Sequence, residues 1–263
     1  MFTTYFVLWA VYFFVLGAAV GSFLNVVIVR IPFEQSIVVP RSKCPTCGSQ
    51  IRAYDNIPLL SYLLLHARCR DCGTHISIRY PLVELITAVC FLGLYMKYGL
   101  SPALGVFGVF CAAMIVVFCI DLEHMIIPDA ISLNLIPVGM ASAVIGILPD
   151  MDWKSSLIGF VLGGAVLYVP ALIYFLIRGV EGLGGGDVKL LAMMGAFLGP
   201  YGVIFVLLAS SFVGSIVGII GMIFRKTDST TPIPYGPFIA GAGMLYVFVG
   251  QEIIQVLFGT NSY

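Results

Sequence analysis

The segment SPALGVFGVFCAAMIVVFCIDLEHMIIPD, residues 101–129, contains twenty uncharged residues before its first acid, Asp121. A helical run of this length can cross the hydrocarbon core of a bilayer. An ionised carboxylate at the middle of a membrane helix costs at least about 2.5–3.5 kcal/mol. That cost raises the question of why an acid directly follows so long an apolar run.

The composition of the whole chain is that of a membrane protein. Hydrophobic residues make up 60% and charged residues 10% of the 263 positions, whereas about a quarter of a soluble domain is charged. This composition predicts the lipid bilayer as a partner, and no nucleic acid is expected; the formal net charge of zero says nothing about partners. The N-terminal apolar run has no basic residue before it and no signal-peptide cleavage site after it, so we predict a retained first span.

Eight apolar segments are candidate membrane spans, although the sixth has only twelve residues and would rise about 18 Å as a helix. Eight spans place eleven of the thirteen Lys and Arg residues on one side, which is then cytoplasmic, and deleting the sixth leaves only nine there. We therefore predict an all-α polytopic membrane protein with about eight transmembrane helices and both termini outside. The segments are 5–28, 81–98, 101–121, 129–148, 155–178, 187–198, 201–223 and 235–257.

Residues 31–80 form a polar cytoplasmic insertion between a first span at 1–30 and a transmembrane core at 81–263. The insertion has few apolar residues from which to build a core. It contains two matched pairs, Cys44-x-x-Cys47 and Cys69-x-x-Cys72, each followed by Gly. Four thiolates at this spacing predict a zinc-ribbon-like module whose Zn²⁺ is structural, because no ligand position stays open. Two disulfides and a redox pair are the alternatives, and a reducing cytoplasm disfavours the disulfides.

Two acids are predicted on the cytoplasmic face of the core. Asp121 ends the third span, and Asp187 opens the sixth beside Gly184, Gly185 and Gly186. Taken singly, each reads as an interfacial acid or a helix N-cap. Taken together they predict a catalytic dyad that shares one proton and titrates as a unit. The glycines would let a substrate backbone approach closely.

Three other acids have weaker indications. Asp129 follows Pro128 and is predicted to cap the fourth span, whereas Glu123 should point away from Asp121 on a continuing helix. Glu84 has apolar neighbours, and an ion pair with Arg79 or Arg70 is the favoured interpretation.

At this point the chain resembles the type IV prepilin peptidases, membrane aspartic enzymes of type IV pilus and type II secretion systems. The similarity covers nearly the whole chain. It is carried by GSFLNVVIVRIP (21–32), the two CxxC pairs, YDNIPLLSYLLL (54–65), IRYPLVEL (78–85), FCIDLEHMIIPD (118–129) and GLGGGDVKLLAMMGAFLG (182–199). The family's two catalytic aspartates match Asp121 and Asp187.

This resemblance implies an enzyme of the bacterial inner membrane with its active site facing the cytoplasm. Such an enzyme cleaves the basic leader of prepilins and pseudopilins after a Gly. Members with the four-cysteine module usually also N-methylate the new terminal residue with S-adenosylmethionine, for which Asn25 and Glu84 are the candidate contacts. One departure from the family is Ala67, where members commonly have Gly.

Other functions stay open at this stage. The chain could be a peptidase without methylation, a transporter whose acids form an ion site, or a membrane scaffold whose aspartates are caps. A transporter of this kind favours acids at the bilayer midplane and repeated halves, and no sequence repeat is found. Neither the natural substrate, the machinery served nor the oligomeric state follows from the residues.

Overall fold

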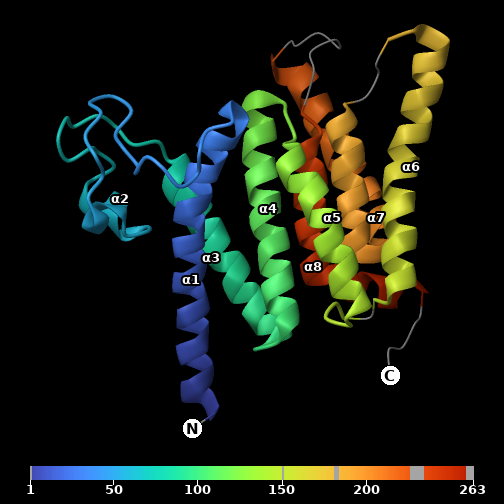
Figure 1. Cartoon of the computed structure of the whole chain (residues 1–263), viewed down its shortest axis with the longest axis horizontal. Helices are drawn as coiled ribbons and strands as arrows, with labels where there is room; N and C mark the ends of the chain where they lie inside the picture. Colours follow the sequence, from blue (N-terminus) through green and yellow to red (C-terminus); the bar gives the residue numbers. More distant parts are fainter. Residues whose placement is uncertain (1, 150, 181–183, 226–233, 259–263) are drawn as a thin grey trace. The chain divides into compact units, whose positions relative to one another are not determined.

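The computed structural model describes residues 2–149, 151–180, 184–225 and 234–258 (Figure 1). The described part of the chain is helical and contains no strand, only two isolated β-bridges. It forms two compact units, Met1–Val116 and Val117–Tyr263. The all-helical prediction is therefore confirmed for these residues.

In the first unit, α1 (Phe2–Arg30) packs against α3 (Arg79–Tyr98). Glycines allow the close approach of the two helices. A Cβ on Gly17 would lie 2.7 Å from the Cα of Ala88, and one on Gly21 would lie 2.6 Å from the Cα of Glu84. Small residues at such contacts are typical of helix pairs in membranes. The two contacts also show that the helices run antiparallel, because the later residue of α1 faces the earlier residue of α3.

The insertion between α1 and α3 is built from turns. Its regular elements are two 3-10 turns, η1 (Ile31–Phe33) and η2 (Ala53–Asn56), and the short helix α2 (Leu60–Leu64). The two isolated bridges, Lys43 with Gln50 and Arg68 with His75, enclose the two cysteine pairs. The first part of α4 (Pro102–His124) completes this unit, with the ring of Phe107 stacked on Tyr98 at 5.0 Å between centroids.

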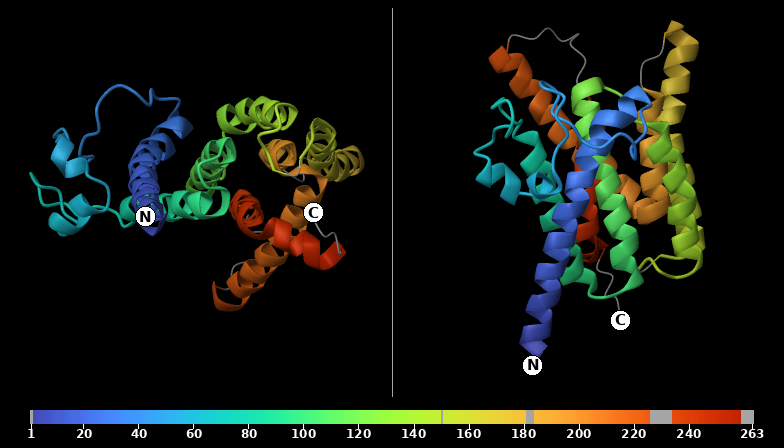
Figure 2. Two further views of the ribbon diagram at one scale, coloured as in Figure 1. Left: turned by 90° about the horizontal axis from the view of Figure 1, so that it is seen from below. Right: turned by 60° about the vertical axis from the view of Figure 1, so that its left-hand side comes forward.

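The second unit surrounds a short central helix. After the end of α4, the unit contains α5 (Asp129–Val144), α6 (Trp153–Arg178), α7 (Gly185–Arg225) and α8 (Gly236–Phe258) (Figures 1 and 2). Every residue from 190 to 199 is buried. Glycines of α5 and α6 pack directly on this segment, since a Cβ on Gly139 would clash with Phe197 and one on Gly163 with Leu191. A helix enclosed by protein on all sides is apolar all round. This explains why the sixth predicted segment, residues 187–198, is apolar although it is short for a membrane span.

The helix α7 contains two arms that meet at Gly199, where φ is 69° and ψ is −176°. The contacts show that the chain reverses there. Near the reversal, Gly202 contacts Tyr246 of α8. Part-way along the second arm, the hydroxyl of Ser210 bonds to that of Tyr235, just before α8, at 2.8 Å. The start of α8 lies near the start of the first arm, because the side chain of Ile127 is 3.1 Å from the Cβ position of Gly236 and 3.0 Å from that of Gly186. The predicted segments 187–198 and 201–223 therefore run in opposite directions.

All eight predicted segments contain a helix, although the fourth, predicted to reach residue 148, ends at Val144. Five helices in the described part of the chain are long and apolar enough to cross a membrane, and α7 with its reversal is one of them. Two shorter apolar helices lie at Asp129–Val144 and Gly236–Gly250. Several apolar helices of this kind identify a multi-pass membrane protein.

Candidate functional site

Asp121 lies in the last turn of α4 with only 5% of its surface exposed. The helix ends after it because Met125, with φ of 55°, donates its N–H to the Asp121 carbonyl at 2.9 Å and turns the chain away. Glu123, which is predicted to point away from Asp121, is exposed whereas Asp121 is buried. The Oδ2 atom of Asp121 is buried and makes no hydrogen bond in the described structure. A buried carboxylate oxygen without a partner is available to a substrate or a water molecule.

Asp187 is half-buried in the first turn of α7. Its backbone N–H donates to the carbonyl of Gly184 at 3.2 Å. A Cβ on Gly184 would lie 3.6 Å from the Asp187 Oδ2 atom, so this glycine forms part of the surroundings of the carboxylate. The side chain of Ile127 connects this turn to Asp121, because it lies next to the Cβ positions of both Gly186 and Gly236, and the latter is 2.6 Å from Oδ2 of Asp121. The second unit therefore brings together two acids that are 66 positions apart in the chain.

Gly236, the first residue of α8, also borders the aspartate site, and the sequence alone did not predict this. A Cβ at this position would lie 2.6 Å from Oδ2 of Asp121. The side chain of Ile127 closes the remaining side, 3.1 Å from the Gly236 Cβ position and 3.0 Å from that of Gly186. The available signal was the turn-forming sequence PYGPF, residues 234–238. Its distance in sequence from either acid gave no reason to connect them.

Asp129 does not cap α5, so that prediction is wrong. The N-cap residue is Pro128, which makes no side-chain cap bond. Both oxygens of Asp129 instead accept from Lys189 Nζ at 2.8 Å. This ion pair joins the start of α5 to the first turn of α7, two residues beyond Asp187. It therefore helps to hold the segment that carries the second acid.

The C-terminal end of α6 extends beyond the level of the two aspartates. Gly163 is level with Leu191, because a Cβ there would lie 2.3 Å from the Leu191 carbonyl oxygen. Asp187 is four residues before Leu191, and Arg178 ends α6 fifteen residues after Gly163. At 1.5 Å per residue, α6 continues about 16 Å past Asp187. The overhang is visible in Figure 1, and its side chains are apolar and exposed.

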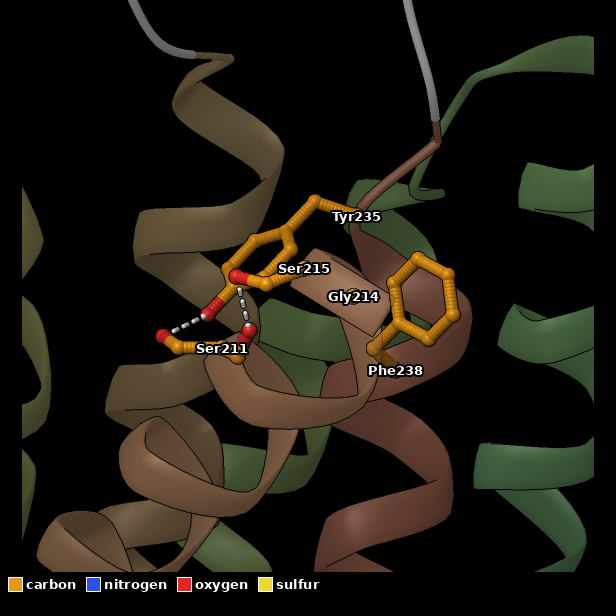
Figure 3. A pocket seen from close by; sticks show the side chains of 5 residues that line it. All are labelled: Ser211, Gly214, Ser215, Tyr235 and Phe238. Atoms are coloured by element: carbon orange, nitrogen blue, oxygen red, sulfur yellow. Dashed lines mark hydrogen bonds between the residues drawn. The ribbon is translucent and has the colours of Figure 1, made fainter. Parts of the chain in front are cut away.

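A pocket of about 310 Å³ lies beside the start of α8, between it and the second arm of α7 (Figure 3). The phenol of Tyr235 is hydrogen-bonded to Ser210 at 2.8 Å and to Ser211 at 3.0 Å. Since Gly236 directly follows Tyr235, the pocket adjoins the wall that faces Asp121. Its lining residues are Ser211, Gly214, Ser215, Tyr235 and Phe238.

The four predicted zinc ligands are brought together in the first unit. The sulfur atoms of Cys44, Cys47, Cys69 and Cys72 all lie within 4.8 Å of one another. The Sγ atoms of Cys44 and Cys72 are 3.8 Å apart. Four sulfurs at 2.3 Å from one tetrahedral zinc ion are about 3.8 Å from one another. The donor set and its spacing therefore fit Zn²⁺, and the cysteines form no disulfide.

The two cysteine pairs form the same turn twice, 25 positions apart. Gly48 donates its N–H to the carbonyl of Cys44 at 2.9 Å, and Gly73 donates to that of Cys69 at 2.9 Å. Both glycines have positive φ, 73° and 71°, which only glycine adopts at little cost. A hydroxyl two residues after the second cysteine completes each turn, 3.3 Å from its sulfur: Ser49 in the first and Thr74 in the second.

Hydrogen bonds in these turns favour the thiolate form that binds metal. Hydrogen bonding with the Thr74 side chain and backbone lowers the pKa of Cys72 to about 6. The backbone N–H groups of Cys47 and Thr46 lower the pKa of Cys44. The Cys72 sulfur is thus prepared to be anionic near neutral pH, and the pKa of Cys44 is shifted in the same direction.

The candidate cofactor residues Asn25 and Glu84 lie on facing helices of the first unit. Asn25 donates to the carbonyls of Gly21 and Tyr80 at 3.2 and 3.1 Å, and its Oδ1 atom is buried without a partner. Glu84 accepts the N–H of Leu59 at 2.8 Å. The predicted pairing of Glu84 with Arg70 is wrong.

Arg70 instead makes a bidentate ion pair with Asp55, with a shortest distance of 2.6 Å. Two arms of the cysteine module are thereby joined. The guanidinium of Arg70 holds the pKa of the Asp55 carboxyl below its usual value.

Comparison with known proteins gives two family matches. The bacterial Peptidase A24 N-terminal domain matches residues 15–98, and the type IV leader peptidase family matches residues 108–219. No solved structure matches the chain.

Similar curated proteins carry the description prepilin leader peptidase/N-methyltransferase. One from Burkholderia pseudomallei is 35% identical, with 93% of this chain and 87% of the relative aligned. One from Pseudomonas aeruginosa is 36% identical over 91% and 90% of the two chains. One from Myxococcus xanthus is 42% identical over 87% and 69%. Because both family models match and these relatives align over most of its length, the chain belongs to the type IV leader peptidase family.

Proposed function

We propose that this chain is a prepilin leader peptidase and N-methyltransferase in which Asp121 and Asp187 cleave the leader. The observation that carries the proposal is that Asp121 and Asp187, at the ends of two helices, each lie beside glycine backbone, and that Ile127 contacts both glycine segments. Glycine leaves room for an extended substrate backbone beside the carboxylates. Membership of the family does not favour a transporter.

The chemistry follows from two carboxyl groups that share one proton. Neighbouring carboxylates do not both ionise readily, so one acid of the pair is protonated and the other is ionised. The ionised acid takes a proton from water as the water oxygen attacks the peptide carbonyl. The protonated acid donates its proton to the carbonyl oxygen. Collapse of the tetrahedral intermediate then returns a proton to the leaving amine and regenerates the pair.

Which acid starts in which state is a property of the pair as a whole. The surroundings of the two differ, however. Asp121 is fully buried with a free Oδ2, whereas Asp187 is half-buried beside Gly184. A water molecule bound between them would contact both carboxyl groups and be held for attack.

The position of the acids suits a substrate that is itself embedded in lipid. We propose that the end of the second unit with Arg178 and Arg225 faces the cytoplasm, as the positive-inside rule favours. The apolar overhang of α6 then places the aspartates below the cytoplasmic lipid surface. A prepilin has a basic leader followed by an apolar helix, so its scissile bond would enter from the side. The pocket beside Gly236 would receive an apolar side chain next to that bond.

The cysteine module of residues 31–80 is proposed to bind one structural zinc ion through Cys44, Cys47, Cys69 and Cys72. Methylation of the new N-terminus requires a donor, and S-adenosylmethionine supplies a methyl group on a sulfonium. Asn25 and Glu84 stay the proposed contacts for it. Among their atoms, Asn25 Oδ1 is a buried acceptor with no partner in the described structure.

Mass spectrometry of a co-expressed prepilin tests the proposal. With the unaltered enzyme the mature N-terminus should appear without its leader and with one added methyl group. Asp121→Asn or Asp187→Asn should lower cleavage at least about 100-fold, the lower end of what acid–base groups contribute. Asp152→Asn is the matched control, because Asp152 caps α6 at the opposite end and Asn keeps the cap.

Efficient processing by either dyad variant would exclude the proposed chemistry. Cleavage without the methyl mass would identify a peptidase that does not methylate.

A further inference from the structure

The short helix α2 exposes its apolar side chains and buries its polar one. Leu60, Leu63 and Leu64 are 57%, 69% and 74% exposed, and their i, i+3, i+4 spacing places them on one face. Ser61 is buried, accepting the N–H of Ile57 at 3.0 Å and donating to the carbonyl of Tyr54 at 3.0 Å. A helix on a water-exposed domain has the opposite arrangement. The leucine face is therefore built for apolar surroundings.

One hydrogen bond sets the depth of α2. The N–H of Leu59, just before the helix, donates to Oε2 of Glu84 at 2.8 Å. Glu84 in turn faces Gly21 of α1, as the 2.6 Å Cβ contact shows. Gly21 lies nine residues before Arg30, which ends α1, and this is about 13 Å of helix. The start of α2 is thus level with the apolar part of α1 and not above its end (Figures 1 and 2).

The surface around α2 has the composition of a membrane interface. Two guanidinium groups lie close to the ring of Tyr54, with Arg52 Cζ 5.9 Å and Arg70 Cζ 5.5 Å from the ring centroid. Aromatic residues and arginines gather where an apolar surface meets lipid headgroups, and basic residues are attracted to anionic lipids. The neighbouring helix α3 also exposes Leu82 and Leu85. An apolar surface at this depth is therefore present on both elements.

We propose that the occupant of the leucine face is the lipid bilayer. In this arrangement Leu60, Leu63 and Leu64 insert into the leaflet in which α1 ends, while Tyr54, Arg52 and Arg70 lie at the headgroups. Amphipathic segments of this kind bury their apolar face about 5–10 Å into the boundary of headgroups and acyl chains. The cysteine module is then held against the membrane surface by these leucines and is not a freely moving cytoplasmic domain. This inference does not depend on the proposed catalysis.

Tryptophan fluorescence in vesicles of phosphatidylcholine and phosphatidylglycerol tests the depth. The full chain has two tryptophans, Trp9 and Trp153, and Trp9→Phe with Trp153→Phe gives a silent background. Leu63→Trp introduces a probe on the leucine face, and Thr46→Trp introduces its control at the exposed tip of the first cysteine turn. Lipids brominated on their acyl chains should quench the probe at position 63 at least about twofold more than the control. Acrylamide in the aqueous phase should quench the control more.

Two results would overturn the inference. Equal quenching of both probes by acrylamide would show that the leucine face meets water. Protection of the probe at position 63 from both quenchers would show that a protein surface covers it. Leu64→Trp provides a second probe on the same face, and retention of zinc checks that each variant is folded.

Discussion

The cysteine module and the aspartate site assemble their side chains in different ways. The module places four sulfurs together by repeating one turn, and each turn is complete within eight residues, from Lys43 to Gln50 and from Arg68 to His75. The aspartate site uses the end of α4, the start of α7 and the start of α8, which span 116 positions from Asp121 to Gly236. The module is thus determined mainly by local sequence and its ligand, and the site by helix packing.

This difference predicts that damage to one region should leave the other intact. The cysteine turns have no apolar core, so the proposed metal is expected to supply most of their stability. The aspartate site lies in a unit whose central helix is fully buried, so its geometry should tolerate loss of the metal. Substitutions in each region can therefore be measured with the other region as an internal reference.

The largest expected effect is loss of zinc in Cys44→Ser. Structural zinc contributes about 10–16 kcal/mol in small zinc modules, and three thiolates with one hydroxyl bind the ion far more weakly. Metal analysis should fall from about one zinc per chain to none, while prepilin cleavage is retained. Cys90→Ala, which removes a buried cysteine of α3, is the control and should keep its zinc. Loss of cleavage together with zinc would show that the two regions are not independent.

Gly236→Ala should lower cleavage and leave zinc bound, the reverse of what is expected for Cys44→Ser. In Gly236→Ala the new Cβ would lie 2.6 Å from Oδ2 of Asp121, so the carboxylate or the start of α8 must move. Misplacement by about 1 Å can cost on the order of 100-fold in rate, and cleavage should fall by about that factor with zinc unchanged. Gly241→Ala is the control, since a Cβ there meets nothing within 4 Å. Normal cleavage by Gly236→Ala would remove this wall from the site.

The sequence predicted those parts of both regions that repeat, such as the CxxC pairs, or that adjoin a long apolar segment, such as Asp121 and Asp187. The CxxC pairs predicted the cysteine cluster, and the lengths of the apolar runs together with the distribution of Lys and Arg predicted the eight helical segments. Gly236 was missed because a glycine becomes important only when another helix end approaches it. The overhang of α6 was missed for a similar reason: it depends on the level at which Gly163 meets Leu191, and no local pattern encodes that level.

The pair of Lys189 with Asp129 tests how much a surface contact contributes to the aspartate site. The two side chains are 40% and 56% exposed, and exposed ion pairs contribute about 0–1 kcal/mol. If this energy holds the first turn of α7 in place, Lys189→Met should reduce cleavage by up to about fivefold. Lys154→Met, at the far end of α6, should leave cleavage unchanged. An equal loss of cleavage in Lys189→Met and Lys154→Met would show that removal of a positive charge, and not loss of the pair with Asp129, causes the effect.

The smallest expected effect concerns Ala67, the position where the family commonly has Gly. Ala67 has φ of 58°, a left-handed conformation that costs less for Gly than for Ala. Ala67→Gly should therefore stabilise the module by about 0.5 kcal/mol, roughly a twofold tighter hold on zinc in competition with a chelator. Gly48→Ala should shift the competition the other way. A Cβ at Gly48 meets nothing within 4 Å, so its φ of 73° is the remaining source of strain. If both variants bound zinc like the unaltered chain, the metal rather than the backbone of the turns would determine the module's stability.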